Sequence, residues 1–162
     1  MIATLDAAMY QLGQLFLAPV LIAITVLFAH AFYALGAFLW QGWQRRAGRP
    51  GGFELIGLWQ AQPALSAEAL ELIALQRLDV ARIATRVAPM LGLVATMIPM
   101  GPALRALGEG RMSDVSQALA IAFSAVILAL IAAAVTYTVL NVRRRWYAAE
   151  LAEVEKRRAG AA

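Results

Sequence analysis

Long runs without a charged residue dominate this sequence. No Asp, Glu, Lys or Arg occurs in residues 7–44, 87–104 or 115–142. The shortest run holds 18 residues. A helix rises about 1.5 Å per residue, so each run is long enough to cross the roughly 30 Å hydrocarbon layer of a bilayer. Charged residues make up only 15% of the 162 residues, against about 25% in a typical soluble domain. The sequence therefore predicts an all-α membrane protein with three transmembrane helices.

The first run has features of a retained membrane span. Its densest apolar part is residues 15–40, and Tyr33, Phe38, Trp40 and Trp43 gather near its end, as aromatic residues do at membrane interfaces. Ala29-His30-Ala31 resembles the cleavage site of a signal peptide. However, no Lys or Arg precedes the run and the apolar stretch continues past that site, so we expect it to stay in the protein.

The second and third spans are predicted to continue as helices beyond the membrane. Ser66 is a suitable N-cap for a helix that runs without interruption into residues 87–104. Residues spaced by three and four predict one face of it: Leu70, Ile73, Arg77, Val80 and Ala84. After the third span, residues 143–158 mix acidic and basic residues. We expect this tail to be a helix in water, stabilised by opposite-charge pairs.

Three prolines lie within the second span. Pro89, Pro99 and Pro102 each lack the N–H that an α-helix uses. We therefore expect a kink or a break near the outer end of this helix.

The distribution of Lys and Arg predicts the orientation. None precedes the first span, two (Arg105 and Arg111) lie between the second and third, and the other twelve lie in residues 45–86 and in the tail. By the positive-inside rule the N-terminus is periplasmic and the C-terminus cytoplasmic. The expected segments are an N-terminal periplasmic segment (1–14), transmembrane helix 1 (15–40), a cytoplasmic loop and amphipathic helix (41–86), transmembrane helix 2 (87–104), a periplasmic turn (105–114), transmembrane helix 3 (115–142) and a cytoplasmic tail (143–162).

Several functional classes lack the residues they need. The chain has no cysteine, and no nucleophile–base arrangement is evident, so we do not expect an enzyme or a metal site. Its basic residues flank apolar runs, where they act as membrane anchors in contact with lipid, rather than forming a nucleic-acid-binding face. A transmembrane haem usually needs two axial ligands, and His30 is the only histidine. We expect no cofactor.

Two hydroxyl residues lie near the middle of their spans. Thr96 and Ser124 each follow the start of a span by nine residues, so in antiparallel helices they lie at similar depth. They could line a polar pore, or they could bond their own backbone and allow close helix packing. No span contains a carboxylate, so a proton path would need an acid from another chain.

The stretch Ala88-Pro89-Met90-Leu91-Gly92-Leu93-Val94-Ala95-Thr96 resembles a motif of the MotA/TolQ/ExbB proton-channel family. The family pattern is Ala-Pro-x-x-Gly-Leu-x-Gly-Thr, with Ala95 here in place of a glycine. The resemblance extends over about residues 66–147. It implies a ring-shaped oligomer, typically a pentamer, in the bacterial inner membrane. It also implies a single-span partner similar to ExbD or TolR that supplies an essential aspartate, and proton flow that drives mechanical work.

The resemblance makes Thr96 the pore threonine. The family usually has a second threonine in the third span, and here the equivalent position falls between Ala122 and Val126, where Ser124 is the one hydroxyl. Gln117 stands where an acidic residue is common. The alternative is therefore a non-conducting membrane scaffold for a transport complex. Small residues predict packing between subunits, at Gly92, Ala95, Ala122, Ala125 and Ala129.

Overall fold

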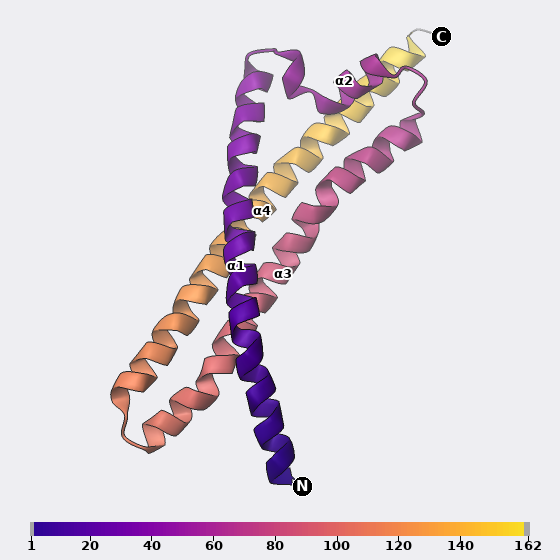
Figure 1. Cartoon of the computed structure of the whole chain (residues 1–162). Helices are drawn as coiled ribbons and strands as arrows, with labels where there is room; N and C mark the ends of the chain where they lie inside the picture. Colours follow the sequence, from indigo (N-terminus) through magenta and orange to yellow (C-terminus); the bar gives the residue numbers. More distant parts are fainter. Residues whose placement is uncertain (1, 161–162) are drawn as a thin grey trace. The chain divides into compact units, whose positions relative to one another are not determined.

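The computed structural model describes residues 2–160, with side chains from residue 8 onward. It consists of the helices α1 (Ile2–Arg46), α2 (Glu54–Ala61), α3 (Ala67–Gly108) and α4 (Met112–Ala159), with a short 3-10 helix, η1 (Pro50–Gly52), before α2 (Figure 1). Within the described residues, three helices are long and apolar enough to cross a membrane: α1 from Ala8, α3 and α4. The prediction of an all-helical chain with three such helices is confirmed.

The helices extend beyond the predicted transmembrane segments, whose limits stay predictions. α1 begins at Ile2, far ahead of the predicted span, and continues to Arg46. The segment predicted to be a loop before Ser66 contains η1 and α2, which the sequence pattern did not reveal. Ser66 does cap α3, because its Oγ accepts a hydrogen bond from the N–H of Ala69 at 3.1 Å.

α3 is continuous through its three prolines. It runs from Ala67 to Gly108 and includes Pro89, Pro99 and Pro102, so the expected break does not occur. Each proline removes one N–H, while the surrounding turns keep their own backbone hydrogen bonds. Membrane helices tolerate proline because neighbouring helices, Ser and Thr side chains and small local adjustments satisfy the backbone groups that lose a partner.

A tight turn joins α3 to α4 (Figure 1). Gly110 has φ +73°, a left-handed conformation that glycine adopts without a steric cost. The N–H of Arg111 donates to the carbonyl of Ala106 at 2.9 Å, and its guanidinium pairs with Glu109 and Asp114. Such a short connection makes α3 and α4 antiparallel where they meet.

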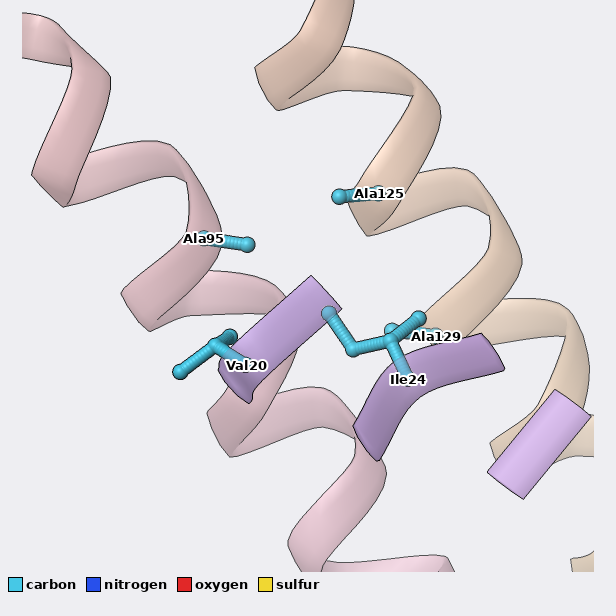
Figure 2. Packing of buried hydrophobic residues seen from close by; sticks show 5 residues of the cluster. All are labelled: Val20, Ile24, Ala95, Ala125 and Ala129. Carbon is cyan, nitrogen blue, oxygen red and sulfur yellow. The ribbon is translucent and has the colours of Figure 1, made fainter. Parts of the chain in front are cut away.

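The chain divides into two compact units. The first comprises Met1–Ala31 and Thr85–Ala134. Its core contains Val20 and Ile24 of α1, Ala95 of α3, and Ala125 and Ala129 of α4, whose side chains point toward one another (Figure 2). Four of these side chains are alanine or valine. The three helices therefore pack through small residues, as membrane helices commonly do.

α3 and α4 approach each other closely at Gly92. A Cβ built on Gly92 would lie 3.0 Å from the Cβ of Ala129 and 3.6 Å from the Cα of Val126. This separation is tighter than normal carbon–carbon contact, so the position accepts only glycine without a shift of the helices. Gly92, Ala95, Ala122, Ala125 and Ala129 are all buried within one chain. Their predicted role between subunits stays a prediction.

The second unit comprises Phe32–Ala84 and Val135–Ala162, and its core is of a different kind. Leu55, Ala74, Leu78 and Tyr147 form a buried cluster of larger side chains. The face of α3 predicted from spacing is partly wrong, because Val80 is 61% exposed. Leu70 and Ala84 of the predicted face are buried, but between them the buried surface runs through Ala74 and Leu78.

Substituting Gly92 by leucine should destabilise the first unit. The added side chain has no room against Ala129, and overpacking of this kind costs about 1–3 kcal/mol. Gly36→Leu is the matched control, since nothing lies within 4 Å of a Cβ at Gly36. Unfolding in detergent micelles, followed by circular dichroism, measures both variants. Equal stability of the two would contradict the close approach of α3 and α4.

Candidate functional site

Thr96 lies on α3 beside the core of the first unit. Its neighbour Ala95 is fully buried, whereas Thr96 itself is partly exposed. Its Oγ1 donates a hydrogen bond to the carbonyl of Leu93 at 2.7 Å. A hydroxyl that donates to its own helix keeps its oxygen lone pairs as acceptors. Thr96 can therefore still accept a hydrogen bond from water or from another chain.

Ser124 lies in different surroundings. It is exposed on α4, and its Oγ donates to the carbonyl of Ala120 at 2.8 Å. It lines a groove of about 350 Å³ together with Leu21, Ile24 and Thr25 of α1. Thr25 shows the same local bonding, donating to the carbonyl of Leu21 at 2.9 Å. Ser124 thus shares its groove with a polar residue of α1, and Thr96 does not line that groove.

The contact at Gly92 shows which part of α4 lies level with Thr96. Gly92 faces Val126 and Ala129, and Thr96 follows Gly92 by about one turn. In antiparallel helices the matching level on α4 is one turn before Val126 and Ala129, at residues 122–125, a range that includes Ser124 and in which Ala122 and Ala125 are buried. The sequence therefore placed Thr96 and Ser124 at similar depth without revealing that Ser124 is on the α1 side of α4. A pore role for Ser124 stays a prediction.

Large apolar side chains remain exposed on the three apolar helices. On α3 they include Met90, Leu93 and Met97, and on α4 they include Phe123 and Ile127. Water would not solvate such surfaces favourably, whereas lipid chains or the apolar faces of other helices would. His30 is also exposed, on α1.

A buried ionic cluster in the second unit was not predicted. Glu150 of α4 is only 2% exposed and forms an ion pair with Arg45 of α1, itself 13% exposed. The other carboxylate oxygen of Glu150 accepts hydrogen bonds from the backbone N–H groups of Leu55 at 2.7 Å and Ile56 at 3.4 Å. These are free N–H groups in the first turn of α2, whose N-cap residue Phe53 provides no side-chain bond. A carboxylate from α4 therefore caps α2.

Glu54 extends the cluster to α3. Its carboxylate accepts hydrogen bonds from Gln41 Nε2 at 2.9 Å and from the Tyr147 hydroxyl at 2.8 Å, and it pairs with Arg77. Burial, helped by the hydrogen bond to Glu54, raises the pKa of Tyr147. Burial lowers the pKa of Arg45, against the opposing effect of Glu54. Burial also acts to lower the pKa of Arg77, but Glu54 and Tyr147 raise it overall.

Sequence spacing contained a signal for this cluster. Glu150 lies in a buried stripe of α4 with spacings of three and four residues, between Tyr147 and Val154. A carboxylate in register with an apolar stripe needs a buried partner. Glu153, by contrast, pairs with Arg157 on the exposed surface at 2.7 Å, as expected for the tail.

Replacing Glu150 by glutamine should strongly destabilise the second unit. The change leaves the guanidinium of Arg45 buried without a counter-charge, which costs about 3–5 kcal/mol. Glu153→Gln is the control and should change stability little, because its ion pair is exposed to solvent. Chemical unfolding in detergent compares the two. The buried pair would be unimportant if both variants unfolded at the same denaturant concentration.

Comparison with known proteins agrees with the three apolar helices and with the motif around Thr96. A model of the MotA/TolQ/ExbB proton channel family matches residues 60–156. No curated protein and no solved structure matches significantly. The matched region includes α3 and most of α4, and therefore both Thr96 and Ser124. The chain is therefore a multi-pass membrane protein that belongs to the MotA/TolQ/ExbB proton channel family.

Proposed function

We propose that this chain is the proton-conducting subunit of an inner-membrane motor driven by the proton-motive force. Several copies, typically five, form a ring around a pore. A single-span partner similar to ExbD or TolR enters that pore and brings an aspartate. Proton flow past this aspartate energises an envelope or transport process.

The distribution of titratable groups carries this proposal. The family is one of proton channels, yet none of the three charge-free runs contains Asp, Glu, Lys or Arg. A proton path usually needs a group that can bind and release a proton near neutral pH. The runs of α3 and α4 offer hydroxyl groups but no carboxylate or histidine, and the one histidine, His30, lies on α1 outside the family-matched residues 60–156. The acid therefore belongs to a partner.

Thr96 is the residue that we assign to the pore. It occupies the threonine position of the family motif, and its hydroxyl oxygen keeps acceptor capacity. The exposed apolar side chains on α3 and α4 leave faces that neighbouring copies or lipid can cover in a ring. Ser124 is a second candidate, with a weaker expected effect, because it lines the groove shared with α1.

Replacing Thr96 by valine should lower proton flux while leaving assembly intact. Valine has the shape of threonine without the hydroxyl. Loss of one hydrogen bond worth about 1.4 kcal/mol corresponds to a roughly tenfold lower proton flux. Proton uptake into liposomes that hold the co-purified complex measures the change. Thr25→Val is the matched control, since Thr25 makes the same bond to its own helix on α1.

Both outcomes of that experiment are informative. Flux that falls for Thr96→Val and not for Thr25→Val supports the pore assignment. Full proton flux in Thr96→Val would contradict the assignment of Thr96 to the pore. A correctly assembled complex with no flux in any form would favour the non-conducting scaffold, an alternative that rests on Ala95, Gln117 and the absence of a third-span threonine at the level of Thr96.

The proposed orientation places the turn between α3 and α4 in the periplasm and the end of α4 in the cytoplasm. The chain has no cysteine, so labelling of a single-cysteine variant shows on which side of the membrane that one residue lies. In intact cells, a membrane-impermeant maleimide should label Ser113→Cys, and it should label Ala159→Cys only after permeabilisation. The reverse pattern would show that the orientation is inverted.

A further inference from the structure

A groove of about 590 Å³ lies between the end of α1 and α4 in the second unit. We call it the aromatic groove; its lining residues are Phe38, Leu39, Gly42, Trp43, Arg45, Arg46 and Trp146. Its volume lies in the range of sites for small molecules, roughly 300–1,000 Å³. Neither the family nor the proposed proton path accounts for it.

The wall of the aromatic groove is built by packed side chains. Phe38 and Trp146 stack with ring centroids 5.0 Å apart and an interplanar angle of 16°. Gly42 keeps the space open, because a Cβ there would lie 3.5 Å from the indole of Trp146 and a longer side chain would fill the groove. Together with Leu39 these residues provide an apolar surface.

One end of the aromatic groove carries a positive charge. Arg45 is neutralised by Glu150 and lies over the ring of Trp146, with 4.4 Å from its Cζ to the ring centroid. Arg46 is exposed and makes no ion pair within the part of the chain that the structure describes. No carboxylate lines the groove. Among the lining residues, the free positive charge is therefore that of Arg46.

The aromatic groove also lies at the end of an apolar run. The charge-free stretch ends at Gln44, directly before Arg45 and Arg46. Trp40 and Trp43, both exposed, flank this boundary in a tilted pair with centroids 5.3 Å apart. Exposed tryptophans and arginines at the end of a span mark the depth of lipid headgroups.

We propose that the aromatic groove binds an anionic phospholipid. The phosphate accepts hydrogen bonds from the guanidinium of Arg46, and the upper part of an acyl chain lies along Leu39, Phe38 and Trp146. A lipid with a net negative charge is preferred over a zwitterionic one, because the groove has no carboxylate to pair with a choline or an ethanolamine group. The inference depends on membrane insertion alone, so it stands whether or not the chain conducts protons.

Native mass spectrometry of the full-length protein in detergent tests the proposal. Phosphatidylglycerol and phosphatidylcholine with the same acyl chains are added separately, and bound lipid is counted. The wild type should retain several times more phosphatidylglycerol. Arg46→Gln should lower its retention about fivefold, as expected for one basic residue at a membrane surface. Arg86→Gln is the control, since Arg86 is an exposed arginine at the start of the second span and outside the aromatic groove.

A second variant tests the apolar part of the site. Gly42→Leu should lower retention of both lipids while Arg46→Gln lowers mainly that of phosphatidylglycerol. Equal retention of the two lipids by the wild type would overturn the proposal. So would equal losses in Arg46→Gln and Arg86→Gln, which would indicate a general effect of surface charge. A change in copy number in Gly42→Leu, with unchanged lipid retention, would show that a second copy of the chain occupies the groove.

Discussion

The absence of charge from the three apolar runs determines how this chain is held together. Residues 15–40, 87–104 and 115–142 contain no Asp, Glu, Lys or Arg, so no ion pair can form among them. The first unit therefore relies on close contact between small side chains. Ala95, Ala125 and Ala129 pack against Val20 and Ile24, and Gly92 allows α3 to approach α4. The ionic groups of the chain are left to the segments that follow the spans.

In the second unit those ionic groups are used to order a short segment. Glu150 pairs with Arg45 and at the same time caps α2, and Glu54 joins Gln41, Arg77 and Tyr147. Helix α2 has only eight residues and no side-chain cap of its own. A helix of that length is marginal alone, so its contacts with α4 explain why it forms. The same cluster turns Arg45 inward and leaves Arg46 exposed in the aromatic groove.

Much of the fold could be predicted from the sequence because it depends on local pattern. The charge-free runs predicted three apolar helices, and Ser66 predicted the start of α3. The motif ending at Thr96 identified the family. The face of each helix that is buried was harder to predict from the sequence. Glu150 and Glu153 look alike in the tail, yet one is buried and the other exposed, because only one lies in register with Tyr147 and Val154.

The candidate site shows the same limit. Counting residues placed Thr96 and Ser124 at similar depth, but the side of α4 on which Ser124 lies depends on where α1 packs. Depth is fixed by helix rise, whereas the direction of a side chain is fixed by tertiary contacts. The features of α3 that matter most for the proposed pore, Gly92 and Thr96, lie within one turn of each other and could be recognised together.

We propose above that this chain provides a proton path and that a partner supplies its acid. The most direct test is proton uptake into liposomes under a membrane potential, with the chain alone and with its co-purified single-span partner. We expect no uptake by the chain alone, uptake with the partner, and loss of uptake when the partner's transmembrane aspartate is changed to asparagine. Proton uptake by this chain alone, at the rate of the complete complex, would contradict it.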